Sequence, residues 1–136
     1  MTTSPPGTAV VAVVDDDAGI LQSIRFLLES ADHSVQVFSS ANAMLESGCI
    51  DSIDCLLTDI DMPGTDGFEL LRIVHEARPL LPVILITGHP ELLDWLPWIG
   101  PEPPQLFEKP FDGQQLLTAI GAALATARSP KRTPDA

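Results

Sequence analysis

The chain alternates between short apolar runs and longer segments in which apolar residues recur at helical spacing. The run 9–14 contains only Ala and Val, which is typical of a fully buried strand. Segment 18–30 instead carries Ile20, Leu21, Ile24, Leu27 and Leu28 at positions that share one face of a helix. The whole pattern predicts strands at 9–14, 34–38, 53–58, 83–86 and 106–108, and helices at 18–30, 41–47, 68–77 and 112–128.

Strands that alternate with helices predict an α/β fold, in which a parallel sheet carries helices on both faces. A polar residue that could belong to a functional site follows every predicted strand except 34–38, which is followed by two serines. Strand order 2-1-3-4-5 places that strand at an edge and makes the other four contiguous, as in a flavodoxin-like, doubly wound (βα)5 sheet. Five prolines between 90 and 104 predict an irregular fourth helix, shortened to about 91–96.

Length and composition favour a single domain. The 136 residues are 45% hydrophobic, which suffices for one compact core but not for two ordinary ones. The ends 1–8 and 128–136 are rich in Pro, Ser, Thr and charged residues, so we expect disordered tails around a domain at 9–127. On this basis we expect a stand-alone module.

Charge and targeting signals narrow the class of protein. Seven Lys and Arg against nineteen Asp and Glu give a net charge of −12. A protein that binds the negatively charged phosphate backbone of nucleic acid carries positive charge on its binding surface. The apolar run that follows the start stops at Asp15, too soon for a signal or membrane segment. Cys49 and Cys55 match neither a redox pair nor a zinc set. We therefore expect a cytoplasmic protein with reduced thiols, no direct nucleic-acid partner and no membrane association.

Polar side chains gather where the predicted strands end. Asp15 and Asp16 follow the first strand, Asp59 the third, Thr87 the fourth and Lys109 the fifth. The carboxyl ends of neighbouring parallel strands converge on one crevice, so these side chains are predicted to share a pocket. Carboxylates, a hydroxyl and an ammonium suit a divalent cation, namely Mg²⁺, together with a phosphoryl group.

Each of these residues has a simpler interpretation when it is taken alone. Asp15, Asp16 and Asp17 together could be a polar loop that caps a helix, and Lys109 could be a solvated charge. However, two carboxylates about 4 Å apart repel by about 4 kcal/mol at an effective dielectric of about 20, so a cluster needs a cation beyond one lysine. Asp59 is then the candidate nucleophile, because a carboxylate can form an acyl phosphate when nearby cations neutralise the phosphoryl oxygens.

Four motifs resemble the receiver domain of bacterial response regulators: VVDDD at 13–17, LLTDIDMPGTDG at 56–67, ILITG at 84–88 and EKPF at 108–111. The resemblance implies that Asp59 accepts a phosphoryl group from a sensor histidine kinase or a histidine phosphotransfer protein. It also implies a role for each matched position: Mg²⁺ on Asp16, Asp59 and the backbone carbonyl of Asp61, with Asp15 acting through water; phosphoryl binding by Thr87 and Lys109; and a cis Lys109–Pro110 bond.

The chain departs from the family pattern in places. Where the family has an aromatic switch residue this chain has Leu106, and the ring of Phe107 is predicted to face the other side of the sheet. Asp61 and His89 occupy positions that influence the lifetime of the phosphoryl group in the family, although His89 could equally be an ordinary loop residue. Trp95 and Trp98 could form a partner surface or could fill the core.

We therefore predict a phosphoacceptor signalling domain, not an enzyme in the ordinary sense, which signals by protein contact or by onward phosphotransfer. One alternative is a receiver fold that binds partners without being phosphorylated. Another is a phosphatase similar to the haloacid dehalogenases, which needs an acidic pair downstream of the lysine. Only Asp112 stands close after Lys109, and the next acidic residue is Asp135 near the end of the chain, which disfavours that alternative.

Overall fold

A computed structural model of the chain describes residues 9–60, 67–89, 91 and 105–132. Within these residues five parallel strands form one sheet in the order β2-β1-β3-β4-β5, as predicted. The elements along the chain are β1 (Val10–Val14), α1 (Ala18–Ser30), β2 (Ser34–Phe38), α2 (Ala41–Ser47), the 3₁₀ turn η1 (Cys49–Asp51), β3 (Cys55–Asp59), α3 (Gly67–Ala77), β4 (Val83–Thr87), β5 (Gln105–Glu108) and α4 (Gly113–Arg132).

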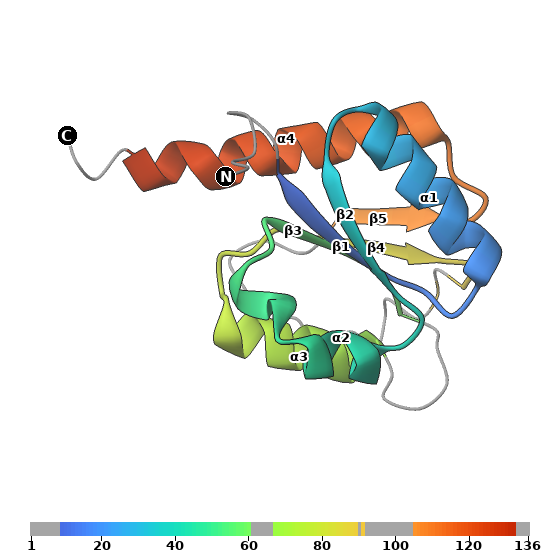
Figure 1. Ribbon diagram of the computed structural model, residues 1–136, viewed down its shortest axis with the longest axis horizontal. Helices are drawn as coiled ribbons and strands as arrows, with labels where there is room; N and C mark the ends of the chain where they lie inside the picture. Colours follow the sequence, from blue (N-terminus) through green and yellow to red (C-terminus); the bar gives the residue numbers. More distant parts are fainter. Residues whose placement is uncertain (1–8, 61–66, 90, 92–104, 133–136) are drawn as a thin grey trace.

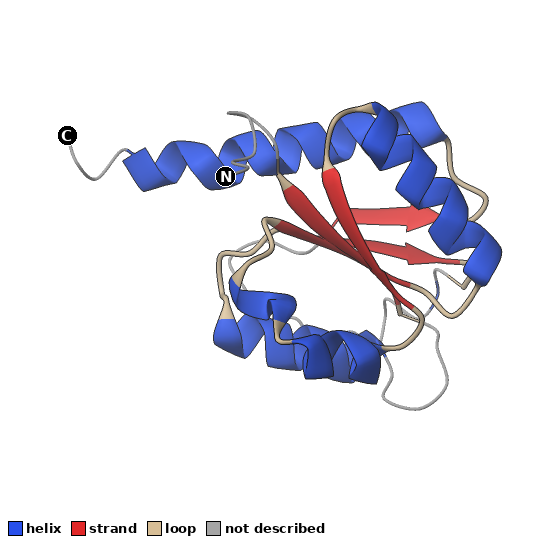
Figure 2. Cartoon of the chain, in the orientation of Figure 1, coloured by secondary structure: helices blue, strands red, loops and turns tan. Residues whose placement is uncertain are grey.

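The sheet lies between two layers of helices. Helices α1 and α4 cover one face, and α2 and α3 cover the other (Figure 1). Figure 2 shows the strands as the middle layer, with helices above and below. This is the doubly wound α/β architecture that the alternating pattern predicts.

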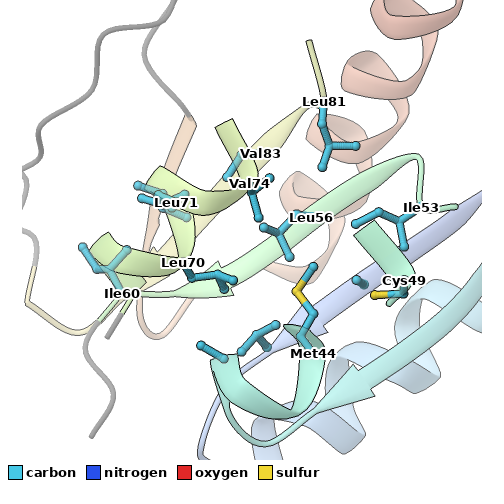
Figure 3. Packing of buried hydrophobic residues seen from close by; sticks show 14 residues of the cluster. Met44, Cys49, Ile53, Leu56, Ile60, Leu70, Leu71, Val74, Leu81 and Val83 are labelled. Atoms are coloured by element: carbon cyan, nitrogen blue, oxygen red, sulfur yellow. The ribbon is translucent and has the colours of Figure 1, made fainter. Parts of the chain in front are cut away.

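Each face of the sheet has its own apolar core, because successive residues of a buried strand point to opposite sides. In β3, Leu56 packs on the α2 and α3 side and Leu57 on the α1 and α4 side. Figure 3 shows the first core, where Met44 of α2 points towards Leu56 and Leu70 of α3 packs beside them. The same alternation separates Leu106 and Phe107 of β5, which pack against different cores as predicted.

Helix starts follow the predicted capping residues. The Asp17 carboxylate accepts hydrogen bonds from the backbone N–H groups of Gly19 and Ile20, at 2.8 and 3.2 Å. The Ser40 hydroxyl accepts one from the N–H of Ala43, at 3.0 Å. These contacts satisfy N–H groups that have no partner inside the helix, and they explain why α1 and α2 begin where the sequence indicates.

Some boundaries differ from the prediction. Helix α4 extends to Arg132, so the expected disordered tail at 128–136 is corrected over 128–132. Leu116, Ile120 and Leu124 bury one face of α4 against the core, and a helix that is already nucleated adds further turns at little cost. The 3₁₀ turn η1 is an additional element. The predicted short helix at 91–96 and the proline-rich stretch to 104 lie outside the described residues, apart from Glu91.

The amino end of the sheet is held by side chains that bond to backbone groups. The Asp54 carboxylate accepts a hydrogen bond from the Val10 N–H at 2.8 Å. The Arg78 guanidinium donates to the carbonyl oxygens of Ile50 and Ile53 through Nη1, at 2.7 and 3.2 Å. Both contacts tie segments distant in sequence to the start of β1 and β3. No helix in the described part of the chain is long and apolar enough to cross a membrane.

Candidate functional site

Strand register brings the predicted site residues to the carboxyl edge of the sheet. Val14 lies beside Thr58, so Asp15 and Asp59 come next on adjacent strands. Thr87 lies beside Glu108, and the Lys109 N–H donates a hydrogen bond of 2.8 Å to the Thr87 carbonyl oxygen. The convergence inferred from strand ends is therefore present in the structure. The Lys109–Pro110 peptide bond is cis, as the family resemblance implies.

Lys109 joins the two buried carboxylates. Its Nζ lies 2.9 Å from Asp15 Oδ2 and 2.9 Å from Asp59 Oδ2. The lysine side chain keeps 20% of its surface exposed, whereas Asp59 keeps only 4% of its side-chain surface. Burial of the ammonium lowers its pKa, but hydrogen bonds to Asp59 and Asp15 outweigh this, so the pKa of Lys109 is raised. Lys109 is therefore held as a cation beside the two buried carboxylates.

Asp15 is the fully buried member of the acidic pair that follows β1. One of its oxygens pairs with Lys109, and Oδ1 accepts a hydrogen bond of 2.9 Å from the Asp17 N–H. Burial raises the pKa of the Asp15 carboxyl, against the opposing effects of the Asp17 N–H and Lys109. Asp16 by contrast is exposed. Asp15 and Asp16 are therefore neighbouring aspartates of which the first is buried and the second is exposed to solvent.

The three carboxylates form a group that could hold a cation. Each of Asp15, Asp16 and Asp59 offers an oxygen, and these oxygens lie within 4.8 Å of one another. Hard oxygen ligands of this kind suit Mg²⁺. Three carboxylates against the single ammonium of Lys109 also leave negative charge that a dication would neutralise. The donor set therefore fits the expected metal.

Thr87 is buried at the end of β4, and its hydroxyl accepts a hydrogen bond of 2.9 Å from the His89 N–H. A threonine hydroxyl that accepts one bond can still donate its own proton, so Thr87 keeps the capacity to bond a phosphoryl oxygen. The His89 side chain is 59% exposed, and its Nδ1 lies 3.6 Å from Glu91 Oε2. The modulating role of His89 stays a prediction.

Asp61, Trp95 and Trp98 lie outside the described residues, so the third metal ligand and the aromatic partner surface stay predictions.

One contact near the site was not predicted from the sequence. The contact that was missed is that of Thr58, whose buried hydroxyl bonds to the carbonyl oxygen of Asp59 at 3.0 Å. The available signal was a hydroxyl residue between an apolar run and the candidate nucleophile.

Comparison with curated proteins gives relatives over most of the chain. The transcriptional regulatory protein FixJ of Azorhizobium caulinodans is 34% identical over 131 residues, which cover 96% of this chain and 62% of FixJ. The response regulator protein TodT of Pseudomonas putida is 34% identical over 119 residues, which cover 88% of this chain and 52% of TodT. The chain therefore spans little more than half the length of these relatives.

Solved structures agree with the sequence relatives. The signal receiver domain of an HD domain-containing protein from Pseudomonas fluorescens matches with a TM-score of 0.81 at 28% identity, over 90% of this chain and 98% of that one. A protein described as a transiently phosphorylated "switch" in bacterial signal transduction matches with a TM-score of 0.75 at 30% identity, over 89% and 98%. A family model, described as the response regulator receiver domain, matches residues 11–121. The chain thus belongs to the response regulator receiver domain family.

Proposed function

We propose that this chain accepts a phosphoryl group on Asp59 from a sensor histidine kinase or a histidine phosphotransfer protein, in a reaction that depends on Mg²⁺. The main support is the position of Lys109 Nζ, 2.9 Å from oxygens of both Asp15 and Asp59, beside carboxylates arranged to hold a dication. An aspartate placed between two cations can carry a phosphoryl group whose charge they neutralise.

The proposed transfer exchanges one bond to phosphorus for another. A carboxylate oxygen of Asp59 attacks the phosphorus atom of a phosphohistidine, an O–P bond forms and the N–P bond breaks. The donor imidazole keeps the electron pair of the broken bond and takes up a proton. Lys109 neutralises the phosphoryl oxygens as the group arrives, and the Thr87 hydroxyl donates to one of them.

The carboxylates at this edge of the sheet would hold the metal ion in this reaction. Asp16 and Asp59 would hold Mg²⁺ directly with the backbone carbonyl of Asp61, and Asp15 would assist through water. When bound, the cation would supply positive charge that neutralises the oxygens of the phosphoryl group. The buried position of Asp15 and its bond to Lys109 support an indirect role for this carboxylate.

The phosphorylated form would act by contact with another protein or by onward phosphotransfer. The net charge of −12 disfavours direct contact with nucleic acid. We propose a cytoplasmic location, in keeping with the free thiols of Cys49 and Cys55. Asp61 and His89 would tune the lifetime of the acyl phosphate.

Incubation with Mg²⁺ and acetyl phosphate, followed by intact-mass measurement, tests this function. Wild type should gain the mass of one phosphoryl group, and Asp59→Asn should gain none. Asp17→Asn is the matched control, because it removes a nearby carboxylate but keeps a residue that caps helices equally well. This control should be phosphorylated as wild type is.

Any of three other results would overturn the proposal. Absence of an adduct in wild type with every phosphodonor would favour a binding module that works without phosphorylation. Steady turnover of a phosphate ester such as p-nitrophenyl phosphate would favour a phosphatase. An adduct that persists in Asp59→Asn would show that another residue is the acceptor.

A further inference from the structure

Thr58 is a buried hydroxyl residue in a strand that does not need one. All five residues of β3 are buried, and Thr58 itself is 0% exposed. Valine has the same branched shape and forms buried strands as well as threonine does. A hydroxyl at such a position costs free energy unless it is hydrogen-bonded. We therefore expect the Thr58 hydroxyl, which lies beside Asp59 in the sequence, to have a hydrogen-bond partner.

That partner is the main chain of Asp59. The Thr58 hydroxyl donates a hydrogen bond of 3.0 Å to the Asp59 carbonyl oxygen, and this contact is buried. The carbonyl belongs to the peptide group between Asp59 and Ile60, where β3 ends. Backbone rotation at this point would change the direction in which the Asp59 side chain leaves the strand. The hydroxyl restrains that rotation.

Asp59 is therefore held from two sides. Thr58 holds the peptide group that follows it, and Lys109 holds its carboxylate at 2.9 Å. The lysine contact must rearrange when a phosphoryl group is added to the carboxylate, whereas the contact with Thr58 involves only the main chain and can persist. A persistent restraint of this kind keeps the nucleophile oriented through the reaction.

We propose that Thr58 is a positioning residue for Asp59, whose hydroxyl holds the peptide group after Asp59 and thereby aims the carboxylate at Lys109 and the divalent cation. The inference rests on the proposed phosphoacceptor function and adds to it a residue that touches neither the phosphoryl group nor the metal. Supporting residues of this kind commonly alter metal affinity and rate when they are removed.

Kinetics of phosphorylation by acetyl phosphate with Mg²⁺ provide the first test. Thr58→Val should lower the rate at saturating donor by about tenfold, with the half-saturating donor concentration within about twofold of wild type, because orientation and not donor binding is lost. Thr58→Ser should restore the wild-type rate. Thr118→Val is the matched control, since its hydroxyl also donates to a backbone carbonyl at 3.0 Å, but on the exposed side of α4.

Calorimetric titration with Mg²⁺ alone provides a second readout that does not depend on phosphorylation. Thr58→Val should bind Mg²⁺ about tenfold more weakly than wild type, and both Thr58→Ser and Thr118→Val should bind as wild type does. Urea unfolding of each variant measures the structural contribution of the hydroxyl separately.

The outcomes separate the two proposals. A Thr58→Val protein that is less stable, but keeps the wild-type saturating rate and Mg²⁺ affinity, would overturn the positioning role. Failure of wild type to take up a phosphoryl group would overturn the proposed function. The Mg²⁺ titration would then test the role of Thr58 by itself. Equal Mg²⁺ affinities of wild type and Thr58→Val, or no Mg²⁺ binding by wild type, would overturn the positioning role. If Thr58→Val does not fold, Thr58→Ser and Thr58→Ala provide the same comparison, with the serine variant expected to be faster and to bind Mg²⁺ more tightly.

Discussion

The two ends of the sheet hold their charged groups in different ways. At the amino end, Asp54 and Arg78 bond to backbone groups of distant segments. At the carboxyl end, the side chain of Lys109 pairs with the carboxylates of Asp15 and Asp59. Backbone partners cannot leave without local unfolding, whereas side-chain partners can exchange with a metal or a phosphoryl group. The first arrangement stabilises the fold, and the second leaves charge available for chemistry.

Lys109→Met is expected to give the largest effect and to act on chemistry. The variant should fold, because the ammonium of Lys109 lies at the carboxyl edge of the sheet and its side chain keeps 20% of its surface exposed. Its rate of phosphorylation by acetyl phosphate should fall about a hundredfold, because one of two cations on the phosphoryl oxygens is lost. Intact-mass time courses measure this rate. A variant that is unfolded at neutral pH without metal would show that Lys109 belongs to the stabilising group instead.

Arg78→Ala should have the opposite profile. Loss of the guanidinium leaves the carbonyl oxygens of Ile50 and Ile53 without this donor, and the free energy of unfolding should fall by about 2 to 3 kcal/mol. Urea denaturation measures the change. The rate of phosphorylation of the folded protein should stay within about twofold of wild type, in line with the distance between the two ends. A large loss of rate in a fully folded variant would contradict the separation of roles.

The pH dependence of stability should reveal the buried state of Asp15. Because burial raises its pKa above the ordinary value of 3.8, the folded protein binds this proton more tightly than the unfolded chain does. Without metal, wild type should therefore lose stability relative to Asp15→Asn as the pH rises from 3.8 through the raised pKa, with no further change above it. Urea midpoints of both proteins across this range provide the measurement, and a relative gain for wild type would reverse the assignment.

Arg72→Ala should have the smallest effect. Arg72 pairs with Glu69 and Glu76 on the surface of α3, with its side chain 52% exposed. Solvent and side-chain entropy cancel most of the benefit of such pairs. Neither the urea midpoint nor the phosphorylation rate should change beyond experimental error. A clear change in either quantity would show that surface ion pairs also contribute to stability or to phosphorylation.

Much of the fold could be predicted because local signals were unambiguous. The caps at Asp17 and Ser40, the alternation that separates Leu106 from Phe107, and the buried run before Asp15 are all properties of neighbouring residues. The length of α4 was underestimated, because packing of Leu116, Ile120 and Leu124 continues a helix into a stretch whose composition resembles a tail. The role of Arg78 could not be foreseen, because its acceptors lie 25 and 28 residues away.

The candidate site divides in the same way. Hydrophobic periodicity and the polar residues at strand ends predicted that Asp15, Asp16, Asp59, Thr87 and Lys109 form one group, because parallel strands place their carboxyl ends at a common edge. The structure brings together the side chains of Asp15, Asp16, Asp59 and Lys109, and the part of Thr87 in phosphoryl binding stays a prediction. Only the packed structure distinguished buried Asp15 from exposed Asp16, paired Lys109 with two carboxylates at once, and connected Thr58 to the main chain of Asp59. Those relations depend on strand register and on the direction in which each chain leaves the sheet, and such geometry is set by contacts between segments that are remote in sequence.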